Sequence, residues 1–214
     1  MKDKSAYSVE VIGGADGPTS FFIGGGRKRK SLRQRAEGIL YNIRKKRIIK
    51  SIEPNPHSLE QVAAYITDKL GFAELDKANE DYQFEYKEMR TSFILKYKPE
   101  LLGALADIPK LKRRDEEGVR EFIEKMEQRQ KAAENIPVDA FDIDLHIYVM
   151  DNKADSEIII ERNYNCISGS STGSKREIRK FNKLYRDIYK YYGVSKEDIE
   201  NNSERFKNLI RVLA

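Results

Sequence analysis

The sequence has little of the chemistry that disulfides, metal sites and membrane spans require. Its single cysteine, Cys166, cannot form an internal disulfide. Two histidines, His57 and His146, are too few to build a Cys/His metal framework. No apolar run approaches the roughly 18 residues of a membrane-spanning helix, and no apolar segment of about 7 to 15 residues marks a secretion signal. We therefore expect a cytoplasmic protein that does not span a membrane and needs no cofactor.

Charge, in contrast, is abundant and unevenly distributed. Lys and Arg number 40 against 35 Asp and Glu, which gives the 214-residue chain a net charge of +5. Between Arg27 and Lys50, eleven basic residues stand against the single acidic Glu37, a local net charge of +10, so the rest of the chain carries 5 − 10 = −5. Such local positive charge favours a polyanionic partner, whether nucleic acid, an acidic protein face or anionic lipid.

Helical and strand patterns do not alternate regularly enough for a parallel sheet, so we predict an α+β fold with a small antiparallel sheet packed against helices. Three parts are expected along the chain. Residues 1–26 are predicted to form a Gly-rich β-hairpin, residues 27–53 a basic amphipathic helix, and residues 54–214 an α+β domain that ends in two helices. Pro54 and Pro56 mark the boundary before the third part, because proline ends a helix.

Within the third part, capping residues and hydrophobic spacing locate the elements. Ser58 and Gln61 form a capping-box pattern, and Gly71 suits the end of the same helix. The other predicted helices cover residues 119–126, 174–192 and 195–213, the last with a break at 201–203. Strands are predicted at residues 82–98, where Tyr, Phe and Ile are frequent, and at 141–150 and 157–164, which pair as a hairpin.

One segment near the N-terminus has a recognisable signature. Residues 11–23 read VIGGADGPTSFFI, and this segment resembles a signature of the β subunit of bacterial sodium-pumping decarboxylases. The resemblance implies a bacterial origin, and it makes Asp16 the counterpart of the acidic residue implicated in Na⁺ translocation in that family. One reading is therefore a soluble relative or accessory of such a decarboxylase. The residues themselves suit a tight hairpin turn, so we interpret the segment as a structural or interaction module.

The basic helix is the first candidate binding site. An apolar stripe of Leu32, Ala36, Ile39 and Ile43 runs along it, with Ser31 placed to cap its start. The candidate polyanion-binding residues are Arg27, Lys28, Arg29, Lys30, Arg33, Arg35, Arg44, Lys45, Lys46, Arg47 and Lys50. So many like charges repel one another unless a partner, or the acidic remainder of the chain, neutralises them. Membrane-surface binding is less favoured, because the stripe lacks Trp and Phe anchors.

A second candidate combines a polar loop with the helix that follows it. The loop Ser168–Ser174 offers hydroxyl and backbone N–H groups at a helix start, where anions bind. Candidate binding residues on the helix are Lys175, Arg176, Arg179 and Lys183, with Tyr185 and Tyr189 at helical spacing for stacking on bases. The loop does not have the spacing of a Walker motif, so nucleotide hydrolysis is not implied. The alternative is a plain loop followed by core tyrosines.

The third candidate is a group of acids that resembles the ingredients of a metal-dependent nuclease. Asp142, Asp144 and His146 alternate along one predicted strand, and Glu157 and Glu161 lie on its predicted neighbour. The opposite face of the first strand is apolar, so these acids are also expected on a solvated face for structural reasons alone. Cys166 has no adjacent histidine that would make it a nucleophile.

These observations favour a non-enzymatic basic binding protein that engages nucleic acid or a nucleoprotein complex. The first alternative is a bacterial or phage interaction module, an inhibitor or adaptor, whose basic surface binds an acidic protein. The second is a metal-dependent nuclease, and the third is the soluble relative or accessory of a sodium-pumping decarboxylase.

Overall fold

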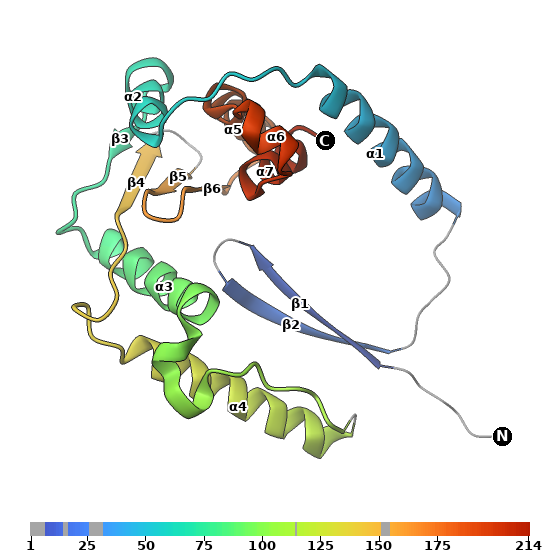
Figure 1. Cartoon of the computed structure of the whole chain (residues 1–214), viewed down its shortest axis with the longest axis vertical. Helices are drawn as coiled ribbons and strands as arrows, with labels where there is room; N and C mark the ends of the chain where they lie inside the picture. The colour runs from blue at the N-terminus through green and yellow to red at the C-terminus, as the bar shows by residue number, and fades with distance from the viewer. Residues whose placement is uncertain (1–6, 15–16, 26–31, 114, 151–154) are drawn as a thin grey trace. The chain divides into compact units, whose positions relative to one another are not determined.

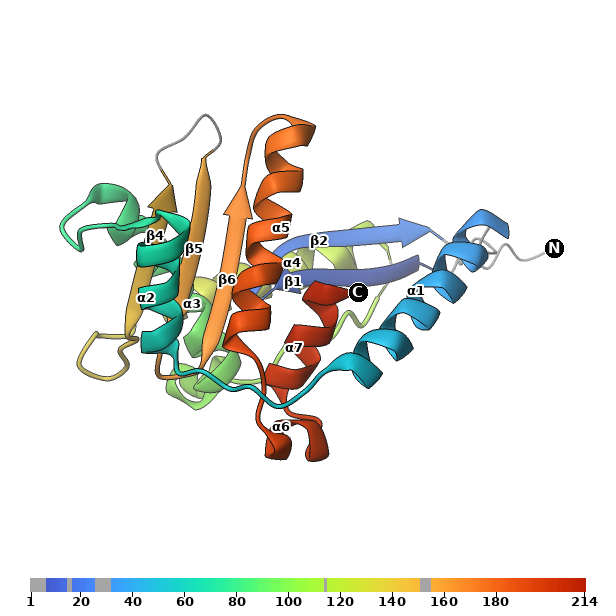
Figure 2. The same cartoon turned by 90° about the horizontal axis from the view of Figure 1, so that it is seen from above.

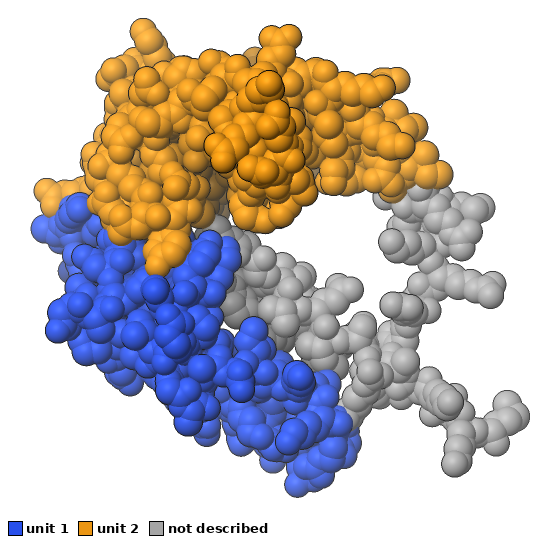
Figure 3. All heavy atoms as spheres, in the orientation of Figure 1, with its two compact units in different colours: residues 1–28, 77–143 blue, residues 29–76, 144–214 orange. Residues whose placement is uncertain are grey.

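The computed structural model of the chain describes residues 7–14, 17–25, 32–113, 115–150 and 155–214. The fold is α+β with a small antiparallel sheet, as the sequence predicts (Figure 1). Contacts group the chain into two compact units: unit 1 comprises residues 1–28 and 77–143, and unit 2 comprises residues 29–76 and 144–214 (Figure 3). The division at residues 26 and 53 stays a prediction, because this grouping does not identify parts that fold independently.

Unit 2 is built on a four-stranded sheet in the order β3-β4-β5-β6, with every neighbouring pair antiparallel. Its strands are β3 (Ala73–Glu74), β4 (Leu145–Met150), β5 (Ser156–Glu161) and β6 (Cys166–Ser171). The predicted hairpin of the strands at 141–150 and 157–164 is confirmed as β4 and β5, although both strands are shorter. The sequence reading missed β6, because its Ser-rich and Gly-containing sequence is typical of a loop.

The helices of unit 2 are α1 (Leu32–Ser51), α2 (Leu59–Leu70), α5 (Lys175–Tyr192), α6 (Lys196–Glu200) and α7 (Glu204–Leu213). Both α2 and α5 pack on the sheet (Figure 2). Their apolar side chains, including Ile66 and Ile188, form one core with Ile158 and Ile160 of β5 and with Leu209 of α7. Removing this apolar surface from water is the main favourable contribution to the stability of the unit.

Local capping explains where two of these helices begin. The Ser58 side chain accepts the Gln61 N–H and the Gln61 side chain accepts the Ser58 N–H, so the predicted capping box is confirmed. Ser174 and Glu177 form the same reciprocal pair at the start of α5. The predicted break at residues 201–203 is confirmed too, because α6 ends at Glu200 and Ser203 caps α7.

Unit 1 contains the antiparallel hairpin of β1 (Tyr7–Gly14) and β2 (Gly17–Gly25). It also contains α3 (Glu80–Tyr97), the 3-10 segment η1 (Pro99–Leu105) and α4 (Glu116–Glu134), which includes the predicted helix at 119–126. The predicted strand at 82–98 is wrong, because these residues form α3. Asn79 caps the start of this helix by accepting the Asp81 N–H, and Tyr82, Met89 and Phe93 are buried on one of its faces. Capping and tertiary packing thus outweighed the β-propensity of the aromatic residues.

Two buried arginines hold irregular segments of unit 1 in place through hydrogen bonds to backbone carbonyls. Arg90 of α3 donates hydrogen bonds to the carbonyl oxygens of Phe141, Ile136 and Pro137, at 2.8, 2.7 and 2.6 Å. Arg129 of α4 donates to three other carbonyl oxygens, those of Leu105, Ala106 and Leu95. A guanidinium group has five N–H donors in a rigid fork, which allows one side chain to satisfy several buried carbonyls. Burial lowers the pKa of Arg129, because it disfavours the charged form.

A third arginine holds together the parts of unit 2 that surround α7. Arg205 donates to the carbonyl oxygens of His57 and Gly193, each at 2.8 Å, and to that of Tyr192. Its guanidinium carbon lies 3.7 Å from the centre of the Tyr192 ring. Backbone N–H groups reinforce the junction, since Asn55 donates to the carbonyl of Val194 at 3.0 Å. The segment between α1 and α2 is thereby attached to the end of α5 and to α7.

No helix among the described residues is long and apolar enough to cross a bilayer.

The junction at Gly193 generates a stability prediction. Gly193 has φ +57°, and a Cβ atom there would lie 2.0 Å from the carbonyl oxygen of Asn55. We expect Gly193→Ala to lower the free energy of unfolding by about 2 to 5 kcal/mol, from backbone strain and from displacement of the segment around Asn55. Gly71→Ala is the control, because Gly71 has φ +77° with nothing within 4 Å of the added Cβ. It should lower the free energy by only about 1 to 2 kcal/mol. Equal effects in urea melts would contradict the argument.

Candidate nucleic-acid interface

Helix α5 carries a stripe of seven basic residues on the side opposite its buried face. The stripe, which we call the α5 basic stripe, consists of Lys175, Arg176, Arg179, Lys180, Lys183, Arg186 and Lys190. All seven are exposed, whereas Phe181, Ile188 and Tyr192 are buried in the core. At 100° per residue the seven lie within an arc of about 140°. Amphipathic packing therefore separates the charges from the core and gathers them on one surface.

The basic side chains of the stripe have few acidic partners. Among the described residues, only Lys190 of the seven forms an ion pair, with Asp187 at 3.3 Å. The contrast is α4, where Lys125 pairs with Glu121 at 2.6 Å and Arg120 pairs with Glu116 at 3.7 Å. The difference lies in composition, because α4 has six acidic residues beside its four basic ones, whereas α5 has only two acidic residues beside seven basic ones. Acidic neighbours four residues away balance Arg120 and Lys125 of α4, and most cations of α5 have no such ion pair with a described residue.

The predicted anion site at the start of α5 is not open. Residues 168–171 belong to β6 rather than to a loop, because they pair with β5. At the helix start, the Glu177 carboxylate accepts the Ser174 N–H at 2.8 Å, and the Ser174 hydroxyl accepts the Glu177 N–H. The hydrogen bond from Ser174 lowers the pKa of Glu177, which favours its negative form. A carboxylate of the chain itself therefore holds the position that an external anion would take.

The two tyrosines predicted to stack on bases lie in or near the core. Tyr189 is 4% exposed, and its hydroxyl donates to the carbonyl of Ile167 at 2.7 Å. Burial raises the pKa of Tyr189. Tyr185 is half-buried, donates to the same carbonyl at 3.4 Å, and has its ring edge-on to Tyr189. Tyr189 has no ring face open to a base, so the helical spacing of these tyrosines reflects packing.

Helix α1 adds a second group of cations to unit 2. Arg44, Lys45, Lys46, Arg47 and Lys50 are all exposed, and none forms an ion pair with a described residue. The predicted residues Arg27, Lys28, Arg29 and Lys30 lie outside the described residues, as do the side chains of Arg33 and Arg35. The predicted apolar stripe is not packed where it is described, since Ile39 and Ile43 are 60% and 43% exposed.

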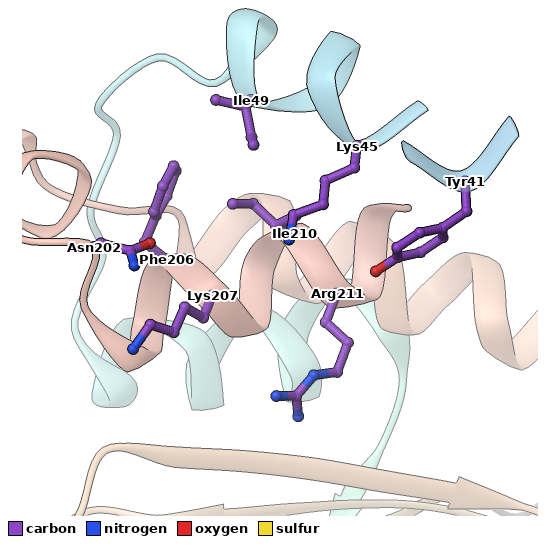
Figure 4. Close-up of a pocket in the computed structure, with 8 residues that line it drawn as sticks. All are labelled: Tyr41, Lys45, Ile49, Asn202, Phe206, Lys207, Ile210 and Arg211. Carbon is purple, nitrogen blue, oxygen red and sulfur yellow. The ribbon is translucent and has the colours of Figure 1, made fainter. Parts of the chain in front are cut away.

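A different face of α1 meets α7 and forms a groove with it (Figure 4). The groove has a volume of about 420 Å³. We call it the α1–α7 groove. Its lining residues are Tyr41, Lys45 and Ile49 of α1, Asn202 shortly before α7, and Phe206, Lys207, Ile210 and Arg211 of α7. Three of these eight residues are basic and none is acidic. Sequence patterns did not identify this site, because it depends on two helices about 160 residues apart in the chain.

The α5 basic stripe and the α1–α7 groove meet at the end of α7. Arg186 donates from Nε to the carbonyl oxygen of Val212 at 3.3 Å, and Val212 follows Arg211 of the groove directly in the chain. Helix carbonyls in the last turn lack helical partners and carry partial negative charge, which makes arginine a favourable neighbour there. Basic residues from three helices of unit 2 therefore lie along adjoining elements (Figure 2).

The acids predicted for a nuclease site do not share one face of the sheet. In the β4–β5 register, Leu145 is opposite Glu161 and Val149 is opposite Glu157, so both glutamates lie on the face of Leu145 and not on that of His146. Glu161 is fully buried and accepts the backbone N–H groups of Asp144, Asn163 and Tyr164. Burial raises its pKa. No group of three metal-ligating residues occurs among the described residues.

His146 and Asp142 have other partners. The His146 ring lies 2.6 Å from Glu74 and 3.2 Å from Asp144, which belong to the same unit. Asp142 belongs to unit 1, where it accepts a hydrogen bond from the Tyr86 hydroxyl. Burial and this hydrogen bond raise the pKa of Tyr86 to about 12. The polar groups at the start of β4 thus form local ion pairs and hydrogen bonds.

The decarboxylase-like signature at residues 11–23 contributes the backbone of β1 and β2. Asp16, the residue that the resemblance singles out, lies outside the described residues. Comparisons with family models, with curated proteins and with solved structures give no match for this chain. The basic surfaces of unit 2 are therefore the features of the described residues that bear most on function.

Because Tyr189 is buried, we predict that removing its hydroxyl changes the stability of the fold and not the affinity for nucleic acid. We expect Tyr189→Phe to lower the free energy of unfolding by about 0.5 to 1.5 kcal/mol, because one buried hydrogen bond is lost. Nucleic-acid affinity should not change. Tyr185→Phe is the control and should have a smaller effect on stability, since its hydrogen bond is longer and partly exposed. Chemical denaturation and a binding titration measure the two effects. Weaker binding by a stably folded Tyr189→Phe variant would restore a direct role for this residue.

Proposed function

We propose that this protein is a non-enzymatic binding protein that engages nucleic acid through the basic residues of α5 and α1. The observation that carries the proposal is the α5 basic stripe, in which seven exposed cations share one side of a helix and only one has an acidic partner among the described residues. A partner that presents many regularly spaced negative charges fits this surface better than a single small anion does.

The length of the stripe supports a polymer as the ligand. From Lys175 to Lys190 the helix rises about 22 Å, at 1.5 Å per residue. Double-stranded DNA carries one negative charge per about 1.7 Å of its axis. Several phosphates can therefore lie within reach of the stripe at one time. Each phosphate neutralised by a Lys or Arg releases condensed counterions, and this release provides affinity without sequence recognition.

Repulsion between like charges within α5 is a second observation that supports a polyanionic partner. Four like-charged pairs lie four residues apart in α5: Lys175 with Arg179, Arg176 with Lys180, Arg179 with Lys183, and Arg186 with Lys190. Each such pair destabilises a helix by about 0.2 to 0.5 kcal/mol. A helix whose only task is to pack against a sheet gains nothing from this arrangement. A bound polyanion relieves the repulsion, so binding and helix stability reinforce each other.

An acidic protein is the alternative partner. Its carboxylates can pair with the same lysines and arginines, and the exposed Ile39 and Ile43 of α1 can contact its apolar side chains. Nucleic acid is favoured because the α5 basic stripe is long, has Asp187 as its one acidic neighbour on that side of the helix, and is free of exposed apolar residues other than Ile178, which is 37% exposed. Protein interfaces usually have an apolar centre within a polar rim.

The test is the salt dependence of binding. We expect the logarithm of the association constant for a labelled duplex of about 20 base pairs to fall linearly with the logarithm of salt concentration, by about 0.9 per phosphate contact. The triple variant Arg176→Glu, Arg179→Glu and Lys183→Glu should lower the magnitude of the slope by about 2.7, because three contacts are lost. Fluorescence anisotropy measures the constants, and circular dichroism checks that α5 remains folded.

A matched control separates the stripe from overall charge. Lys96→Glu, Lys110→Glu and Lys112→Glu change the net charge equally, but these exposed lysines belong to unit 1. This variant should keep the slope of the unchanged protein. Equal loss in both triple variants would mean that binding depends on net charge alone. No binding to duplex or single-stranded nucleic acid at about 50 mM salt, together with a tight complex with an acidic protein, would support the alternative.

A further inference from the structure

The α1–α7 groove has one feature that the α5 basic stripe lacks, an exposed aromatic ring beside basic residues. Tyr41 is 44% exposed, and among the described residues of unit 2 it is the only tyrosine or phenylalanine in the exposed class. Figure 4 shows its side chain reaching from α1 toward the end of α7, on the same side of the helix as Lys45. The core tyrosines of α5 cannot offer a ring in this way.

We infer that the α1–α7 groove binds a single-stranded stretch of nucleic acid, with a base stacked on Tyr41 and the adjoining phosphates held by Lys45 and Arg211. This inference rests on the proposed function and assigns a substrate class to one part of the basic surface. Single-strand binding sites combine a cationic groove that follows the backbone with aromatic side chains on which bases stack. The groove supplies both elements.

The electrostatics of the groove suit a phosphodiester chain. Lys45, Lys207 and Arg211 line it without any acidic residue in the lining. Lys207 forms an ion pair with Glu204 on the same helix at 2.7 Å, and both side chains are largely exposed. An exposed pair of this kind is weak and exchanges easily with a phosphate. Lys45 and Arg211 form no ion pair with a described residue, so they are the main phosphate ligands.

The size and polarity of the groove suit one nucleotide at a time. Its volume of about 420 Å³ lies within the usual range for small-molecule sites, about 300 to 1,000 Å³. Ile49 provides an apolar wall, and the Asn202 side chain offers an amide that can pair with a base edge. A duplex keeps its base faces stacked inside and has none to place against Tyr41, whereas a single strand has free faces.

The neighbouring cations allow the strand to continue beyond the groove. Arg186 of the α5 basic stripe contacts the carbonyl of Val212, next to Arg211. A strand with one base on Tyr41 can therefore pass Arg211 and follow α5, where phosphate contacts need no particular base. This arrangement predicts a protein that binds both forms of nucleic acid through the stripe and gains additional affinity for single strands through Tyr41.

The direct test uses the absence of tryptophan from the chain. Tyr41→Trp places a single tryptophan in the groove, and its fluorescence should be quenched when oligo(dT) of about 15 nucleotides is added, because the base stacks on the indole. A duplex of the same length should leave the emission unchanged. Phe84→Trp is the control, since Phe84 is 64% exposed but belongs to α3 of unit 1, and it should show no quenching with either ligand. Absence of quenching in Tyr41→Trp while oligo(dT) is bound would overturn the inference.

Affinity provides the second measurement. We expect Tyr41→Ala to weaken oligo(dT) binding by about 5- to 150-fold, as expected for loss of one stacked base, and to leave duplex binding unchanged. Tyr41→Phe retains the ring and should bind normally. Lys45→Ala should lower the single-strand salt slope by about 0.7.

The possible outcomes distinguish this inference from the proposed function. If the protein bound duplex and single strand with equal affinity, and Tyr41→Ala changed neither affinity, the inference would be overturned and the proposed function would stand. Failure of the unchanged protein to bind either nucleic acid would overturn both. Equal loss of both ligands in Tyr41→Ala would also overturn the inference, because stacking cannot explain a loss of duplex binding. Thermal unfolding of each variant checks that the substitution at this exposed position leaves the protein stably folded.

Discussion

The basic surfaces of unit 2 depend on one partly buried junction, the hydrogen bonds that Arg205 donates to the carbonyl oxygens of His57, Tyr192 and Gly193. These carbonyls belong to the segment before α2 and to the end of α5, and Arg205 itself lies in α7. The guanidinium therefore joins three parts of the chain that no single strand or helix connects. The same segment leads back to α1, so the junction helps to place α1 beside α7. An apolar side chain could fill the space but could not satisfy three carbonyl groups.

The chain uses its positive charge for two different purposes. Arg90, Arg129 and Arg205 donate to backbone carbonyls and replace the hydrogen bonds that water would make with irregular segments. The lysines and arginines along α5 and α1 remain on the surface. A count of basic residues along the chain cannot separate these two groups. The excess charge that a partner could meet is the exposed part. In unit 2 it lies on α5, whose opposite face is buried, and on α1, which is exposed along most of its described length.

The aromatic residues show the same separation. The chain places most of its described tyrosines and phenylalanines in cores, where Tyr189 and Tyr192 pack edge to face, and leaves Tyr41 exposed beside cations. A buried tyrosine contributes apolar area and a hydrogen bond, whereas an exposed one beside basic residues offers a stacking surface. In unit 2, the exposed cations and the Tyr41 ring are the features on which the proposed binding of a phosphate backbone and a base rests.

The sequence by itself determined the features that depend on near neighbours. These are the capping box at Ser58, the break before α7, the hairpin of β4 and β5 and the α+β class. Such features depend on hydrogen bonds and periodicities that span a few residues. Residues 82–98 form a helix and not the predicted strand, because the packing of one face of that helix outweighs the β-propensity of its aromatic residues.

Only the tertiary structure decided which groups of distant segments share a surface. It placed Glu161 on the face of Leu145, buried Tyr189, and brought Tyr41 of α1 next to Arg211 of α7. Strand register and helix packing set these outcomes. A shift of one residue in register reverses the face of every side chain, and the helix that α1 faces is chosen by contacts about 160 residues away. Local patterns contain no information about such pairings, because the energy that selects them comes from burial of the whole core.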